Sequence, residues 1–227
     1  MRNIRAVFTK QVLSFFKNPS MYGAPAFFLL LPIMFVFFVP GLAENANLVV
    51  AQFVVLFVGI SMIGTASGFL AEDRATMNLR FMGMAGVKPY QYLIGTCVGL
   101  ILISFVAIIA FSIIGGLWRD FVVFGNFIIV SMLGAICSML LGITLSLTKL
   151  APFTMIFAMV LGIGPIFAEA NDSLANIFEF VYTHRVNITI LEYLYHDITE
   201  TLRVIFLNMA ILLVAFIFTS ARRRLDD

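Results

Sequence analysis

Residues suited to binding chemistry gather between positions 72 and 95, in EDRATMNLRFMGMAGVKPYQYLIG. On a helix, Met77, Phe81 and Met84 would share one face, because they follow the spacing i, i+4, i+7. A short amphipathic helix of this kind lies on a membrane surface or binds a partner protein. A charged connecting loop without a partner is the alternative. The charged residues of the stretch are Glu72, Asp73, Arg74, Arg80 and Lys88.

Motifs for catalysis are missing from the sequence. It contains no GxxxxGK[ST], no HExxH and no CxxC. Glu192 and His196 lie four residues apart, but two ligands are too few for a metal site. The long apolar runs hold no histidine or aspartate, which disfavours an intramembrane protease and an ion-coupled pump. We therefore expect a chain that is not an enzyme and that binds no cofactor or metal.

The elements that must position these residues are membrane spans. The 227-residue chain is 62% hydrophobic and 11% charged, and its apolar runs recur along the whole length. A spanning helix needs about 20 apolar residues, and the pattern shows no barrel alternation. We expect an all-α, polytopic membrane protein in which residues 1–227 form a single transmembrane domain. The predicted spans are 24–40, 48–71, 92–117, 124–147, 151–168 and 204–219, the fifth broken near Pro165.

Three segments between or before these spans are too polar to cross a membrane. Residues 1–19 alternate basic and apolar side chains with helical spacing, which predicts an interfacial helix. Residues 72–90 form the polar loop described above. Residues 169–203 hold two apolar clusters around Thr183, His184 and Arg185, which predicts two short helices in the outer leaflet. An amphipathic external loop without a gating role is the alternative.

The distribution of charge predicts the orientation of the chain. With the N-terminus inside, eleven of the fourteen basic residues lie on the cytoplasmic side. Only Arg119, Arg185 and Arg203 then lie outside. The positive-inside rule therefore predicts a multi-pass protein of the cell membrane with both termini in the cytoplasm.

The 72–95 stretch resembles the cytoplasmic loop of ABC-2 type transporter permeases. There an acidic-basic cluster, a "TL-x-x-L"-like core and a "V-x-P-x-x-Y-x-x-G" tail form the coupling helix that docks on the ATPase subunit. This chain departs from that pattern at Thr76, where many relatives have Gly, and at Thr96, where many have Lys. The matching residues are Glu72, Arg74, Asn78, Leu79, Arg80, Phe81, Val87, Pro89, Tyr92 and Gly95.

The resemblance implies three sets of functional residues, and it places re-entrant helices over the pathway between spans five and six. Residues that couple to the ATPase would be Glu72, Asp73, Arg74, Leu79, Arg80, Phe81, Met82, Val87 and Pro89. The interfacial helix would contribute Arg5, Phe8 and Lys10. The outer gate would hold Phe180, Tyr182, His184 and Tyr193.

The same resemblance implies partners, because six spans make half of a transport pathway in that family. They would be two ABC ATPase subunits, which carry the ATP and Mg, a second permease chain, identical or homologous, and membrane lipid, with no nucleic acid. The implied function is that of an ATP-driven exporter that works by alternating access. The apolar, uncharged spans predict an amphipathic or hydrophobic cargo, such as a drug, a peptide or a lipid-like molecule. A membrane channel or scaffold protein without an ATPase is the alternative.

Overall fold

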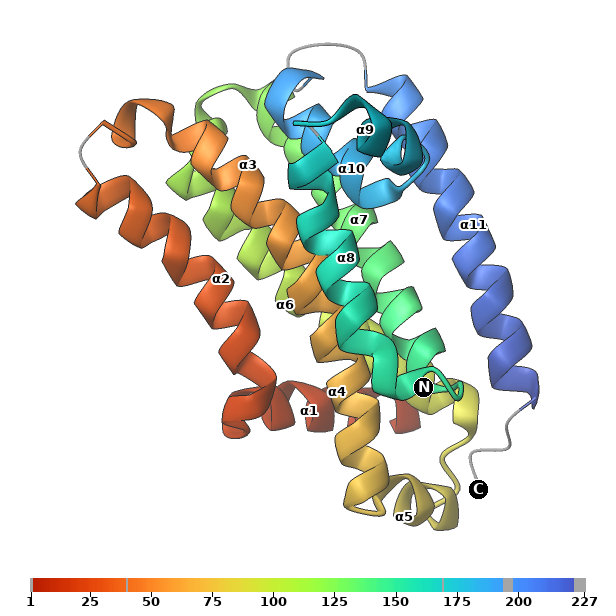
Figure 1. The fold of residues 1–227 in the computed structure, drawn as a ribbon. Coiled ribbons are helices and arrows are strands. Elements are labelled where there is room, and N and C mark those ends of the chain that lie inside the picture. The colour runs from red at the N-terminus through yellow and green to blue at the C-terminus, as the bar shows by residue number, and fades with distance from the viewer. Residues whose placement is uncertain (1, 40, 169, 194–197, 223–227) are drawn as a thin grey trace.

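The computed structural model describes residues 2–39, 41–168, 170–193 and 198–222. Within these ranges the chain forms helices and no strand (Figure 1). Six of the helices are long and apolar enough to cross a membrane. The protein is therefore an all-α, multi-pass membrane protein. The six candidate spans are Met21–Phe38, Ala46–Ala75, Tyr90–Ile114, Phe121–Ser146, Ala151–Ala168 and Thr199–Thr219.

The order of the helices follows the expected order of spans, with short helices between them. The first half of the chain contains α1 Arg2–Lys17, α2 Pro19–Phe38, α3 Ala46–Leu56, α4 Met62–Ala75, α5 Asn78–Met84 and α6 Pro89–Ile114. The second half contains α7 Phe121–Ser146, α8 Thr154–Ala168, α9 Asp172–Phe178, α10 Tyr182–Ile188 and α11 Thr199–Arg222.

The second span is longer than the expected 48–71. It comprises α3, a π-helical turn at Phe57–Ser61, and α4, which together run without a break to Ala75. Glu72, Asp73 and Arg74 therefore lie on the last turn of a helix and not in a loop. The prediction of a break at Pro165 was wrong, because α8 continues through this buried proline to Ala168. Neighbouring helices and local backbone adjustments make a proline tolerable within a membrane span.

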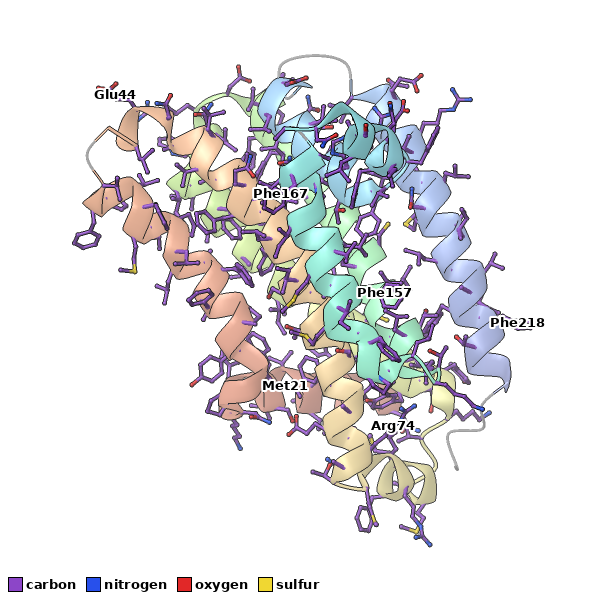
Figure 2. The ribbon with its side chains drawn as sticks, in the orientation of Figure 1. Met21, Glu44, Arg74, Phe157, Phe167 and Phe218 are labelled. Carbon is purple, nitrogen blue, oxygen red and sulfur yellow. The ribbon has the colours of Figure 1, made fainter. Side chains whose placement is uncertain are left out.

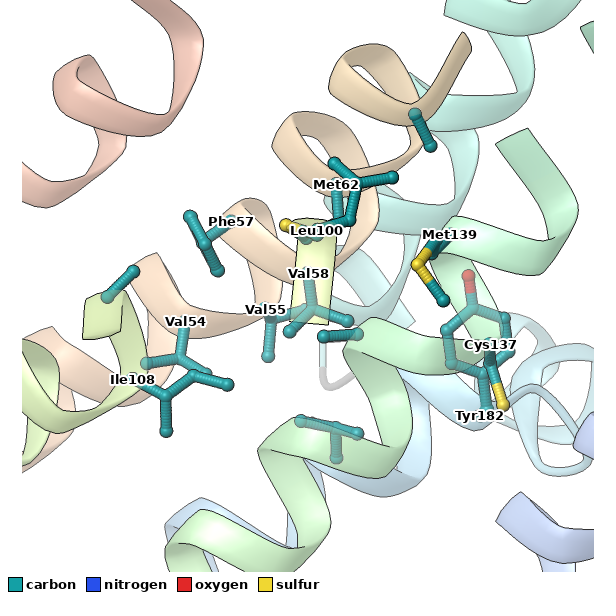
Figure 3. Close-up of a cluster of buried hydrophobic side chains, with 14 of the residues drawn as sticks. Val54, Val55, Phe57, Val58, Met62, Leu100, Ile108, Cys137, Met139 and Tyr182 are labelled. Carbon is teal, nitrogen blue, oxygen red and sulfur yellow. The ribbon is translucent and has the colours of Figure 1, made fainter. Parts of the chain in front are cut away.

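The core lies between α3, α4, α6 and α7, and its side chains come from all four helices (Figure 3). Phe57, Phe111 and Phe127 are fully buried there. By contrast, α2, α8 and α11 expose most of their apolar side chains. Phe157 and Phe218, on α8 and α11, lie on the flank of the bundle (Figure 2). Such a surface suits a hydrocarbon surrounding, in which apolar side chains need no burial.

Close helix contacts depend on glycine at two places in the bundle. A Cβ added to Gly59 in the π-helical turn would lie 2.4 Å from Cα of Gly162 on α8. A Cβ added to Gly142 on α7 would lie 2.6 Å from the carbonyl oxygen of Ile63 on α4. Both distances are shorter than carbon contacts allow, so small residues let these backbones approach.

The two ends of the bundle differ in their short helices. At one end, α1 lies across the base of the spans and α5 lies beyond it, at the tip of α4 (Figure 1). We call this the α5 end. At the opposite end, α9 and α10 lie between α8 and α11 (Figure 1). Arg74 marks the α5 end and Glu44 the opposite end (Figure 2).

Candidate partner-docking site

A residue with positive φ lies at each end of α5. Met77 adopts the left-handed conformation (φ 54°) and turns the chain sharply out of α4. At the other end, Gly86 (φ 76°) closes a Schellman motif, in which its N–H bonds the Gly83 carbonyl and the Val87 N–H bonds that of Met82. Pro89 then starts α6 at once, which is its favoured position in a helix. The segment from Gly86 to Pro89 therefore fixes where α5 ends and where α6 begins.

One face of α5 is an exposed apolar stripe. The side chains of Met77, Phe81 and Met84 are 60%, 60% and 68% exposed. The structure exposes all three residues whose spacing predicted a shared face, with Phe81 and Met84 in α5 and Met77 at its N-cap. Arg80 is exposed beside them. We call Met77, Phe81 and Met84 the docking stripe.

The remaining predicted contact residues of this region face the protein. Leu79, Met82 and Val87 are half-buried and pack against the hydrophobic core. A notch of about 290 Å³ lies between α1 and α5, and Met82 and Val87 help to line it. These residues are therefore placed to hold α5 on the bundle. The side chain of Pro89 lies outside the described set.

Asp73 is the centre of a buried polar network at the α5 end. Asp73 is 2% exposed, and its carboxylate forms an ion pair with Lys10 of α1. The Gln11 amide donates to it at 3.0 Å, the Tyr92 hydroxyl at 2.7 Å and the Asn78 amide at 3.2 Å. A buried carboxylate needs such partners, because its desolvation is otherwise unfavourable. Asp73 thereby connects α1, α4, α5 and α6.

Three further contacts join these helices to one another and to α7. Gln11 also donates to the hydroxyl of Thr96 on α6, at 3.1 Å. Asn18, between α1 and α2, donates to the Glu72 carboxylate at 2.9 Å. Arg74 donates to the carbonyl oxygen of Ser146 at the end of α7, at 2.7 Å. These contacts would therefore transmit a displacement of α5 or of the end of α4 to α1, α6 and α7.

The close packing of α1 on α6 explains Gly95. A Cβ on Gly95 would lie 2.8 Å from the Cβ of Val7 and 3.1 Å from the carbonyl oxygen of Ile4. Only glycine permits this approach, and the approach brings Gln11 to Asp73. Of the residues predicted for the interfacial helix, Arg5 is exposed, Phe8 is half-buried and Lys10 is held by Asp73.

The described exposed charges at this end are basic. Arg5, Arg80 and Lys88 are exposed, whereas Asp73 is buried and Glu72 is half-buried. Asp73 and Lys10 neutralise one another within the bundle. The surface around the docking stripe therefore favours an acidic partner surface.

The second predicted set lies at the opposite end, on and before α10. Tyr182 is buried, and its hydroxyl is 2.8 Å from the Ser138 hydroxyl on α7. Phe180 exposes its side chain, but its carbonyl oxygen accepts a 2.8 Å hydrogen bond from the Asn208 amide on α11. The side chain of Tyr193 lies outside the described set. The turn before α10 is therefore anchored inside the bundle.

His184 is buried in the same segment, with its ring edge-on to that of Phe178. Its Nδ1 atom is buried and has no hydrogen-bond partner in the described residues. Burial lowers the pKa of His184 from its ordinary value, and the nearby charge of Arg185 lowers it further, while Glu179 acts in the opposite direction. The neutral imidazole is therefore favoured.

Several of these residues were missed by sequence reasoning, although two carried a signal. Gln11 follows Val7 by four residues and precedes Phe15 by four, so a polar side chain interrupts the apolar face of α1. Asn208 carries an amide inside a predicted span, where a polar side chain requires a hydrogen-bond partner. Asn78 matched the loop motif, but nothing in the sequence predicted its bond to Asp73. Ser138 gave no signal for its contact with Tyr182, because serine is common in membrane spans.

The geometry offers no metal chemistry in the described residues, which contain no group of three His, Cys, Asp or Glu side chains. His196, the second member of the four-residue pair, lies outside them. Comparison with protein-family models finds no match to this chain, and comparison with curated proteins finds none either. The fold and the two sites must therefore carry the functional argument.

Proposed function

We propose that this chain is the membrane-spanning permease subunit of an ATP-driven transporter of the ABC-2 type. In this proposal α5 is the coupling helix, and its docking stripe enters a groove on a separate ATPase subunit. The observation that carries the proposal is the exposure of Met77, Phe81 and Met84 on a short helix beyond the tip of a span. Exposed apolar patches mark surfaces that meet a protein partner or a membrane, and the position of α5 beyond the tip of α4 favours a protein partner.

The Asp73 network gives the docked helix a route into the membrane. Closure of two ATPase subunits would push on α5, and the network connects α5 with α1, α4 and α6. A force on α5 would thereby move whole spans, since helices are stiff and the network is buried. The ATP and Mg would belong to the ATPase, and the chain would act through binding alone.

The remaining parts of the proposal concern topology. The α5 end would face the cytoplasm of the cell, with both termini, and α1 would lie in the interface of the inner leaflet. The segment α9–α10 would then be a re-entrant pair that caps the pathway from outside. The hydrogen bond from Asn208 to the Phe180 carbonyl supports this, because backbone at membrane depth must find partners within the protein.

The cargo would be amphipathic or hydrophobic, and the direction export. The six candidate spans are apolar, and their charged residues in the described part of the chain lie at the span ends, which disfavours an ion-coupled pump. Two permease chains would enclose the pathway, because six spans form half of it in the proposed family.

The deciding experiment is a pull-down of the tagged full chain from its native membrane in mild detergent. We expect a P-loop ATPase to copurify in about equal copy number, and the Phe81→Asp variant to lose it. An aspartate in the docking stripe would face the acidic partner surface and would leave an apolar pocket of the partner unfilled.

The matched control is Phe153→Asp. Phe153 is 51% exposed at the α5 end but lies in the short turn before α8. It should keep the ATPase. Recovery of a stable chain without any ATPase, or equal ATPase recovery with Phe81→Asp, would refute the proposal. The channel or scaffold function would then be favoured.

A further inference from the structure

An apolar groove lies where α1 meets α2, on the side of the bundle that faces away from α11. Its floor comes from α1, and its walls come from α2 and α6. The cavity volume is about 370 Å³, within the range of about 300–1,000 Å³ that is common for ligand sites. We propose that this groove binds one acyl chain of an anionic phospholipid whose headgroup lies at the Lys17 end of α1.

The lining is apolar on all three sides. Val12, Phe15 and Phe16 contribute from α1, and Leu102 and Val106 from α6. Among the described residues that line the groove none is charged, and Tyr22 carries the polar side-chain group. Water in such a groove would find few hydrogen-bond partners, whereas a hydrocarbon chain needs none. The remaining lining residues are Tyr22, Pro25, Ala26, Leu29, Ile103 and Ala107.

The groove keeps its shape because the elbow between α1 and α2 is fixed. Met21 donates to the Asn18 carbonyl and Asn18 to that of Ser14, so the two helices join with almost no loop. Phe15 lies edge-on to Phe16 at a centroid distance of 5.3 Å, and to Tyr22 at 6.4 Å. These rings belong to α1 and α2 and line the groove where the two helices meet.

The position of the groove selects a lipid as its occupant. Its walls belong to two candidate membrane spans, so it opens sideways into the hydrocarbon region. Phe27 and Leu30 of α2 are exposed close by, each at 56%. Lipid is thus the molecule in contact with this surface at the highest concentration, and its acyl chain matches the lining in chemistry.

The charge of α1 selects an anionic headgroup. The helix carries Arg2, Arg5, Lys10 and Lys17 and no acidic residue. Lys10 is paired with Asp73, but Lys17 is exposed and directly follows Phe16 of the groove. A basic side chain near a membrane surface contributes about 1 kcal/mol of attraction to anionic lipid, which corresponds to roughly a fivefold preference. Glu72 lies near the elbow but is bonded by Asn18.

The test is native mass spectrometry of the full chain, purified in mild detergent with equal amounts of phosphatidylglycerol and phosphatidylcholine. We expect one retained phospholipid, with phosphatidylglycerol preferred about fivefold. Ala26→Phe fills the groove and should abolish retention. Lys17→Gln should retain one lipid without a preference between the two headgroups. No ATPase takes part, so this result is independent of the proposed function.

Two controls keep the test specific. Ala24→Phe changes an exposed position on the same helix, and Lys149→Gln removes an exposed lysine at the α5 end. Both should retain lipid as the unchanged chain does. The proposal is overturned if Ala26→Phe retains as much lipid as Ala24→Phe, or if Lys149→Gln removes the preference as fully as Lys17→Gln. It is also overturned if the groove holds a second copy, so that Ala26→Phe converts a dimer to a monomer without loss of lipid.

Discussion

Replacing Asp73 with alanine should loosen the whole α5 end of the bundle. The change removes a buried carboxylate and leaves the Lys10 ammonium, the Tyr92 hydroxyl and the Asn78 amide without their acceptor. Removing one partner of a fully buried ion pair costs about 3–5 kcal/mol. Lys10 is 31% exposed and regains some hydration, so we expect about 3 kcal/mol. Gln11 keeps its bond to Thr96, which limits the loss.

A thermal assay in detergent can measure this cost, with a thiol-reactive dye as the probe. Cys97 is half-buried and directly follows Thr96 of the network, and Cys137 is buried in the core. Both thiols become reactive when the bundle opens. For a chain of this size, 1 kcal/mol shifts the midpoint by about 2–4 °C, so Asp73→Ala should lower it by about 6–12 °C. Asp73→Asn should lower it by about half as much, because the amide oxygen still accepts from Tyr92.

The comparison variant is Arg80→Ala, since Arg80 is exposed on α5 and should leave the midpoint within about 1–2 °C. A double variant of Asp73 and Lys10, both to alanine, should cost less than the two single changes added together. If the Asp73→Ala and Arg80→Ala variants have the same thermal midpoint, the Asp73 carboxylate does not hold α1 on α4 and α6. The mechanical route proposed above then fails.

Three other outcomes follow from the geometry. Gly95→Ala should lower the unfolding free energy by about 1–3 kcal/mol, because the new methyl group collides with Val7; dye-detected melting measures it. Asn208→Leu should cost about 1–2 kcal/mol and speed amide exchange in the turn before α10, because the Phe180 carbonyl loses its donor. The lowered pKa of His184 means that the unfolded chain binds its proton first; stability should therefore fall as the pH drops below about 6.5, and His184→Phe should weaken this fall.

Each of these expectations has an outcome that would contradict it. Gly99→Ala is the control for Gly95, since its new Cβ would meet Gln11 at an ordinary 3.6 Å; equal melting of the two variants would argue against close packing of α1. Unchanged exchange before α10 in Asn208→Leu would mean that the amide is not needed there. An identical pH profile for His184→Phe and the unchanged chain would assign the acid sensitivity to other groups.

The spans could be predicted from the sequence because lipid imposes a simple rule on length and polarity. The exposure of Met77, Phe81 and Met84 could be predicted as well, since they are spaced apolar residues in a polar stretch. The sequence did not predict that the side chain of Asp73 is buried in the bundle. Its burial requires α4 to continue for another turn and α1 to lie across the tip of that helix, and neither is a local property. The continuity of α8 through Pro165 was missed for a similar reason, because packing from other helices overrode the local rule.

The π-helical turn at Phe57–Ser61 has a mechanical consequence for the docking stripe. A π-helical turn contains one residue more than an α-helical turn, so α4 is out of phase with α3 by about 100° of rotation and 1.5 Å of rise. The contact of Gly59 with Gly162 holds the backbone at this place. If the π-helical turn moved to another position along the span, the helix between the two positions would rotate and shift along its axis. The rotation would change the direction of Phe81. The direction in which the docking stripe points therefore depends on the hydrogen-bond register at Phe57–Ser61 as well as on the turn at Met77.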